Sequence, residues 1–266
     1  IQIETVLTGF GYTAGPAWSP ENFLVFSDVP GRKILKVTQT GTSILRENSG
    51  GASGNAFDKR GRLHTCEAHT RRLSRTDAKG KVEVLAENFE GKRLNAPNDL
   101  CIADTGHIFF TDPAYGNQQD KRELPFHGIF HVSPKGDLRL AARFETRPNG
   151  IALSADDKRL FVSNSDERNI RVYDVSKEGL LTGERIFATK MEGIPSGLHS
   201  DDKGNLWVAA RNILLFDASG KSLGHIPLRD TPSGCTLVLG DPTTLYVTAR
   251  KTVYRVRLDE KGASAN

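Results

Sequence analysis

Sulfur-containing residues are scarce in this chain, whose 266 residues include only three cysteines and one methionine. Cys66, Cys101 and Cys235 form an odd set without a CxxC spacing. This argues against a disulfide framework, so buried free thiols are the default expectation. Long hydrophobic runs are also missing, and none approaches the length of a membrane span. Together with the lack of long helical periodicity, these absences argue against a helical protein and against a membrane partner.

Charge of one sign is not concentrated anywhere along the chain. The 36 Lys and Arg residues exceed the 32 Asp and Glu residues by four, and the pI is near 8.9. The basic residues occur as short pairs such as 71–72 and 121–122 rather than as a stripe interleaved with aromatics, which argues against a nucleic-acid partner. The chain begins at Ile1 rather than Met, so the compartment stays open: cytoplasmic, or periplasmic or secreted if a signal peptide was removed.

Glycine and proline are plentiful, with 26 and 12 copies. Many of them lie in or beside a sequence pattern that occurs six times along the chain and that we call the phrase. A small residue and a Gly-rich step lead into an apolar strand, a turn with Asp or Gly, and a second apolar strand. The phrase opens at Ala14, Ser53, Asn98, Asn149, Ser196 and Ser233. These openings are 37 to 51 residues apart, a period typical of the blades of a β-propeller.

The strand pattern completes the fold prediction. Each repeat has a second strand rich in β-branched and aromatic residues, namely 23–27, 62–66, 107–111, 159–163, 205–209 and 244–248. The last repeat ends after its third strand, while residues 3–7 have a strand pattern and no hairpin partner, so we expect them to close the last blade. The sequence thus predicts an all-β protein, a single six-bladed β-propeller domain over residues 1–266.

A propeller brings one position of every blade to a central channel, so the six residues that open the repeats are expected to line one cavity. The longest interval between strands, residues 113–126, has no strand pattern. It is expected either to cover the mouth of this channel or to be an ordinary surface insertion.

Several phrases then point to a known family. Residues 93–100 read RLNAPNDL, 110–116 read FTDPAYG, 147–154 read RPNGIALS and 204–208 read GNLWV. Together, over nearly the whole chain, they resemble the gluconolactonase family of regucalcin-like six-bladed propellers. The resemblance implies a central divalent metal ion, most often Ca²⁺, held by a Glu, two Asn and an Asp from four blades. It also implies that this ion polarises a lactone or related ester carbonyl for attack by water.

This chain departs from the family pattern at the implied metal site. The two Asn correspond to Asn98 and Asn149, but Ala14 and Ser196 stand where the family usually has Glu and Asp. The hydroxyl of Ser196 is the remaining candidate ligand. Because calcium affinity depends strongly on the number of charged ligands, we expect the ion to bind weakly or to be absent.

Other residues are candidates for chemistry. Asp99 could act as an acid or base, add an oxygen ligand, or anchor backbone. Glu67 and His69 could form a general-base pair, with a structural role in a loop as the alternative. Substrate contacts are expected from Asn95, Ser53, His127 and Ser233. No Gly-x-Ser-x-Gly elbow surrounds the serines that open repeats, which disfavours a serine nucleophile.

Three functions remain open at this point. The first is a gluconolactonase-like hydrolase of a lactone or ester with a reduced metal site. The second is a metal-independent reaction in the same channel with Glu67, His69 or Asp99 as acid or base, since strictosidine-synthase-like propellers do not require a catalytic metal. The third is a non-catalytic, ligand-binding propeller, because fold alone does not decide function.

Overall fold

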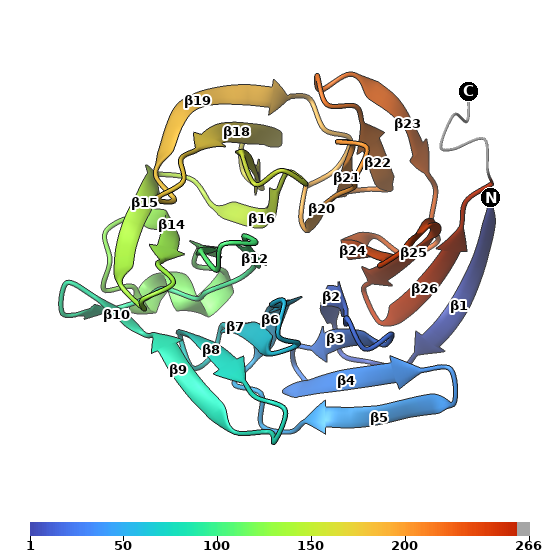
Figure 1. Ribbon diagram of the computed structural model, residues 1–266, viewed down its shortest axis with the longest axis horizontal. Coiled ribbons are helices and arrows are strands. Elements are labelled where there is room, and N and C mark those ends of the chain that lie inside the picture. The colour runs from blue at the N-terminus through green and yellow to red at the C-terminus, as the bar shows by residue number, and fades with distance from the viewer. Residues whose placement is uncertain (260–266) are drawn as a thin grey trace.

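The computed structural model describes residues 1–259, which form six four-stranded antiparallel sheets around a central axis (Figure 1). The opening segment of each repeat is innermost, and the fourth strand of each sheet lies at the rim. The predicted all-β six-bladed propeller is confirmed. Within the described residues, no helix is long and apolar enough to cross a membrane.

The first three blades follow one another along the chain. Blade 1 consists of β2 (Thr13–Trp18), β3 (Leu24–Asp28), β4 (Lys33–Thr38) and β5 (Gly41–Arg46). Blade 2 consists of β6 (Ala52–Phe57), β7 (Leu63–Glu67), β8 (Arg72–Thr76) and β9 (Val82–Ala86). Blade 3 consists of β12 (Leu100–Ile102), β13 (Ile108–Asp112), β14 (His127–Val132) and β15 (Leu138–Phe144).

The other three blades complete the ring. Blade 4 consists of β16 (Pro148–Leu153), β17 (Arg159–Asn164), β18 (Asn169–Val175) and β19 (Leu181–Ala188). Blade 5 consists of β20 (Leu198–Ser200), β21 (Leu206–Ala209), β22 (Ile213–Phe216) and β23 (Ser222–Ile226). Blade 6 consists of β24 (Pro232–Val238), β25 (Asp241–Ala249), β26 (Thr252–Arg257) and β1 (Gln2–Thr8). A two-stranded ribbon of β10 (Asn88–Phe89) and β11 (Lys92–Arg93) and the 3-10 helix η1 (Gly116–Lys121) lie outside the sheets.

The hairpins between strands form because their residues satisfy the turn locally. In the hairpin between β6 and β7, Asp58 Oδ1 accepts hydrogen bonds from the backbone N–H groups of Arg60 and Arg62 at 2.9 and 3.0 Å. Gly61 adopts a φ of 71° in the same turn, a conformation that a residue without a Cβ takes at no steric cost. Such short turns keep each blade a continuous antiparallel meander.

The hydrophobic core lies between neighbouring blades rather than inside any one of them. Phe110 and Phe130 of blade 3 are fully buried against Leu73 of blade 2, whereas Phe109 faces Leu160 of blade 4. The alternation of side chains along a strand thus sends successive aromatic residues to opposite faces of one sheet. Burial of each such side chain stabilises the fold by roughly 1.5–3 kcal/mol.

The N-terminal strand closes the ring, as predicted. β1 pairs antiparallel with β26, with Ile3 opposite Val256 and Glu4 opposite Arg255. In Figure 1 the two strands run side by side at the rim of blade 6. The sequence indicated residues 3–7 for this strand, and the structure extends it by one residue at each end.

Two histidines meet where blade 3 faces the β18–β19 hairpin of blade 4. His107 Nδ1 and His131 Nε2 lie 2.6 Å apart, so one ring donates a hydrogen bond to the other. The Cα of Gly179 approaches so closely that a Cβ there would lie 2.5 Å from His131 Nε2. Burial, together with the positive charges of Arg139 and His107, lowers the pKa of His131 to about 4.

We expect this contact to make the protein sensitive to acid. His131 protonates near pH 6.5 in the unfolded chain but only near pH 4 in the folded protein. Its contribution is therefore intact above pH 6.5 and is lost as the pH falls toward 4. Melting temperatures measured from pH 7.5 to 4.5 should fall less steeply in His131→Gln than in the native protein. His225→Gln, which changes an exposed histidine of β23, is the matched control and should melt with the native slope; an unchanged slope in His131→Gln contradicts the expectation.

Candidate functional site

The six residues that open the repeats line one cavity in the centre of the propeller. This cavity has a volume of about 680 Å³. Its wall includes Ala14, Ser53, Asn98, Asn149, Ser196 and Ser233, which we call the ring. The prediction that these six residues share one cavity is confirmed. From the ring the cavity continues along the inner strands to the opposite end of the channel, where Asp104, Ser154 and Ser200 line it.

The position after each ring residue is glycine in five blades and aspartate in the third. The glycines are needed because adjacent inner strands almost touch. A Cβ on Gly15 would lie 2.0 Å from the backbone oxygen of Ser53, and one on Gly150 would lie 2.1 Å from that of Ser196. Of these six positions, only that of Asp99 carries a side chain, and its carboxyl group lines the cavity next to the ring residue Asn98.

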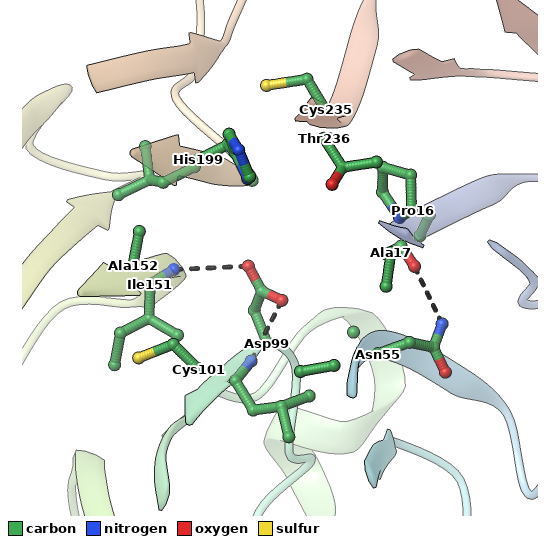
Figure 2. A pocket seen from close by; sticks show the side chains of 18 of the residues that line it. Pro16, Ala17, Asn55, Asp99, Cys101, Ile151, Ala152, His199, Cys235 and Thr236 are labelled. Atoms are coloured by element: carbon green, nitrogen blue, oxygen red, sulfur yellow. Dashed lines mark hydrogen bonds between the residues drawn. The ribbon is translucent and has the colours of Figure 1, made fainter. Parts of the chain in front are cut away.

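Asp99 is held by backbone groups of two blades. Its Oδ1 accepts a hydrogen bond from the N–H of Leu100 at 3.0 Å, and its Oδ2 accepts one from the N–H of Ile151 in blade 4 at 3.3 Å. Figure 2 shows the carboxyl group projecting into the cavity with its contact to Ile151. Burial raises the pKa of Asp99 to about 7 despite these two hydrogen bonds. Within residues 1–259, no Lys or Arg forms an ion pair with it.

The remaining polar groups of the ring are neutral. Asn149 donates a hydrogen bond from Nδ2 to Ser165 Oγ at 2.9 Å. The side chains of Asn98 and Ser196 line the cavity and make no hydrogen bond with another described residue. The hydroxyl of Ser53 is likewise left to the cavity. The ring therefore presents amide and hydroxyl groups that can pair with a polar ligand.

This donor set does not fit a tight calcium site. Calcium requires six to eight oxygens, and its affinity follows the number of charged ligands. The ring supplies the amide oxygens of Asn98 and Asn149 and the hydroxyl of Ser196, none of which is charged. Ala14 contributes only a methyl group, and both oxygens of Asp99 accept backbone hydrogen bonds. Among the described residues, no three His, Cys, Asp or Glu side chains gather as a metal-binding group.

The structure does not place Glu67 and His69 in the channel. Glu67 is fully buried at the end of β7 and accepts hydrogen bonds from Arg46, Arg72, Ser74 and Thr70 at 2.5–2.7 Å. Burial acts to raise the pKa of Glu67, but these hydrogen bonds and the charge of Arg46 outweigh it and lower the pKa. His69 is exposed, and within residues 1–259 no hydrogen bond joins it to Glu67. This geometry favours the structural alternative, in which Glu67 ties blade 2 to blade 1.

Three predicted substrate-binding residues also have structural partners. The Asn95 side chain donates hydrogen bonds to the backbone oxygens of Asp112 and Phe126, which anchors both ends of the 113–126 loop. The Ser233 hydroxyl donates a hydrogen bond to the backbone oxygen of Thr13 at 2.6 Å and so joins blade 6 to blade 1. His127 is buried beside Arg122, with 3.4 Å between Nε2 and Nη1, and does not line the cavity. Only Ser53 of the four predicted contacts has its side chain available at the ring.

The structure adds residues that the sequence reasoning missed. Tyr115, at the start of the 113–126 loop, lines the cavity together with Tyr12, so this loop does border the channel. His199 lines the cavity further along, and burial lowers its pKa to about 4. A signal for both was available, because Tyr115 belongs to the FTDPAYG phrase and His199 occupies the repeat position that is Ala17, Ala56 and Ala152 in other blades.

Fold and site together define an all-β propeller with a central cavity, and concave sites of this kind are where small molecules commonly bind. A family model described as the SMP-30/gluconolactonase/LRE-like region matches residues 12–251. The chain therefore belongs to this family, and membership supports a lactonase-type hydrolase with a small-molecule substrate.

Individual relatives agree with this assignment. The chain is 34% identical over 289 residues to a gluconolactonase from Zymomonas mobilis subsp. mobilis, and the match covers 96% of this chain and 81% of the relative. It is also similar to the solved structure of a gluconolactonase from Xanthomonas campestris, with a TM-score of 0.91 and 34% identity over 97% of this chain and 89% of the other. A calcium-binding regucalcin from Agrobacterium tumefaciens shares the fold, with a TM-score of 0.79 at 17% identity over 94% and 90% of the two chains.

Proposed function

We propose that this protein hydrolyses a lactone or a related ester at the ring end of the channel without depending on a tightly bound divalent ion. The observation that carries the proposal is the set of polar groups at the ring. Asn98, Asn149 and Asp99 line one cavity in a chain that belongs to the gluconolactonase family. Ala14 and Ser196 line the same cavity but add no charge to it.

The residues of the chain suit distinct tasks in such a reaction. Asn98, Asn149 and Ser196 hydrogen-bond the polar groups of the substrate and hold its carbonyl in the cavity. Asp99 takes a proton from a water molecule as the water oxygen bonds to the carbonyl carbon. The C–O bond within the lactone then breaks, and its oxygen takes the proton back from Asp99. A hydroxy acid is released. General acid–base catalysis of this kind contributes about 10²–10⁴-fold.

The proposal is tested by replacing the carboxyl group without changing its shape. Asp99→Asn should lower kcat for D-glucono-δ-lactone by about 100-fold or more, with a melting temperature near that of the native protein. Asp104→Asn is the matched control, because Asp104 lies at the opposite end of the channel, pairs with Lys59 at 2.9 Å and is 70% exposed. The control should keep native activity, and a chelator should leave native turnover unchanged.

Other outcomes separate the alternatives. Turnover that disappears with a chelator and returns with Ca²⁺ contradicts metal independence. Native-like turnover in Asp99→Asn removes Asp99 from the reaction. Absence of turnover, together with binding of a non-hydrolysable lactone analogue, supports a ligand-binding propeller instead of a hydrolase.

A further inference from the structure

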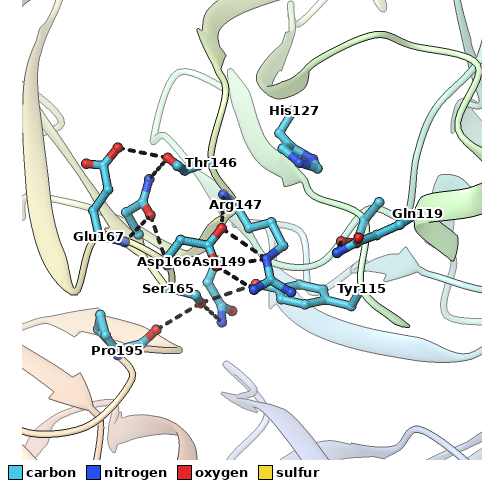
Figure 3. Close-up of polar contacts among 12 residues, drawn as sticks. Tyr115, Gln119, His127, Thr146, Arg147, Asn149, Ser165, Asp166, Glu167 and Pro195 are labelled. Carbon is cyan, nitrogen blue, oxygen red and sulfur yellow. Dashed lines mark hydrogen bonds and ion pairs between the residues drawn. The ribbon is translucent and has the colours of Figure 1, made fainter. Parts of the chain in front are cut away.

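A hydroxyl group behind the ring joins three parts of the site. Ser165 follows β17, is buried, and lies behind Asn149 (Figure 3). Its Oγ accepts the hydrogen bond from Asn149 Nδ2 at 2.9 Å. It also lies 3.3 Å from the hydroxyl of Tyr115 and 3.4 Å from the backbone oxygen of Pro195, the residue before Ser196. Blades 3, 4 and 5 therefore meet at one side chain.

The three partners of Ser165 fix which of its hydrogen bonds are donated and which are accepted. A serine hydroxyl donates one hydrogen bond and accepts two. The Pro195 oxygen can only accept, so Ser165 donates to it. Tyr115 and Asn149 then act as the two donors to Ser165 Oγ.

This arrangement decides which atom Asn149 presents to the cavity. If the amide were reversed, its oxygen would face Ser165 Oγ, whose only proton is already donated to the backbone oxygen of Pro195. The Nδ2 group is therefore held against Ser165, and Oδ1 is left to the cavity that Asn149 lines. Asn149 therefore presents its amide oxygen to the cavity as a hydrogen-bond acceptor.

Tyr115 is held in place from outside by Arg147. The guanidinium carbon of Arg147 lies 5.0 Å from the centre of the Tyr115 ring. Arg147 is itself held by Asp166, whose two oxygens lie 3.1 and 3.0 Å from its Nε. Figure 3 shows this group packed along the side of Asn149. The side chain of Tyr115, which lines the cavity, is therefore held on one side by Arg147 and at its hydroxyl by Ser165.

We propose that Ser165 is a positioning residue for substrate specificity: by orienting Asn149, it makes the site select lactones that carry a hydroxyl group over unsubstituted ones. The inference rests on the proposed hydrolase function. A substrate hydroxyl donates to Asn149 Oδ1, whereas an unsubstituted lactone displaces water and leaves this acceptor unpaired. Leaving a buried acceptor unpaired is costly, so the site discriminates against a ligand that lacks the hydroxyl group, as other sites built around a hydrogen bond do.

The test compares D-glucono-δ-lactone with δ-valerolactone, which has the same six-membered lactone but no hydroxyl groups. The native protein should prefer the hydroxylated lactone in kcat/KM by about tenfold or more. Ser165→Ala should remove most of this preference through a higher KM for the hydroxylated lactone, with δ-valerolactone turnover within about twofold of native. Ser165→Thr, which keeps the hydroxyl, should retain the preference. Asn149→Ala should remove it directly.

Matched measurements separate this effect from damage to the fold. Ser200→Ala makes the same change at the opposite end of the cavity and should keep the native preference. An equal loss toward both lactones in Ser165→Ala, or an unchanged preference, overturns the proposal. If Ser165→Ala does not fold, the preference in Asn149→Ala decides: its loss supports the proposal and its retention overturns it.

If the native protein hydrolyses neither lactone, the proposed function fails but the inference is still tested by binding. Calorimetry then compares the hydroxylated δ-lactam of gluconic acid with δ-valerolactam. A preference for the hydroxylated lactam that is lost in Ser165→Ala supports the positioning role. Equal binding of both lactams, or binding of neither, overturns it.

Discussion

Ala14→Glu combined with Ser196→Asp is expected to create a calcium site, with an affinity about a hundredfold or more above that of the native protein. Both residues line the ring, and the amide oxygens of Asn98 and Asn149 belong to the same cavity. The two substitutions add the negative charges that a hard divalent ion needs to offset its dehydration. Calorimetric titration with Ca²⁺ measures the gain.

The controls for this prediction change residues that line the same cavity. Each single substitution should bind Ca²⁺ with intermediate affinity, and addition of Asn149→Ala to the double variant should weaken binding again. Tight binding by the native protein would show that the site has a charged ligand beyond Asn98, Asn149 and Ser196, and would implicate Asp99. No gain in the double variant would mean that the cavity is shaped for another ligand, which favours a metal-independent reaction or a binding role.

Deletion of residues 1–8 should lower the melting temperature sharply, by roughly 10 °C or more. The deletion removes β1 and exposes the backbone edge of β26, including the partners of Ile3 and Glu4. It also removes Leu7, which packs against the cluster that joins blade 6 to blade 1. An open strand edge further promotes aggregation, so light scattering should rise before the truncated protein melts.

The matched control keeps the strand and removes only its ion pair. Glu4 pairs with Arg255 at 2.6 Å on the exposed side of β1, and exposed pairs of this kind contribute about 0–1 kcal/mol. Glu4→Ala should therefore change the melting temperature by no more than a few degrees. If the truncated protein melts with the full chain, β1 does not close the propeller in solution.

The fold could be predicted because its signals are local. Each blade is recognised in the sequence by an apolar run, a turn with Asp or Gly, and another apolar run. Such patterns depend only on neighbouring residues. The missing outer strand of the last repeat was equally visible as an imbalance between the two chain ends. The absence of Glu and Asp at positions 14 and 196 could be read directly once the family pattern was recognised.

The roles of individual site residues could not be predicted in the same way. Glu67 looked available as a base, yet its partner Arg46 comes from β5 in the preceding blade and neutralises it. Ser233 opened its repeat as Asn98 did, yet its hydroxyl is turned to Thr13, 220 residues away in the chain. Sequence spacing says which residues come to the axis but not which way each side chain turns.

By itself, the sequence determined the six repeats, the closing strand, the family resemblance and the uncharged residues at positions 14 and 196. Only the tertiary structure showed that the carboxyl group of Asp99 lines the cavity, that Glu67 is hydrogen-bonded by four side chains outside it, and that Ser165 contacts both Tyr115 and Asn149. The physical reason is that strands form from local patterns, whereas the partners of a buried polar group come from whichever blade packs beside it. Charge, burial and orientation at the ring are therefore properties of the closed propeller rather than of any one repeat.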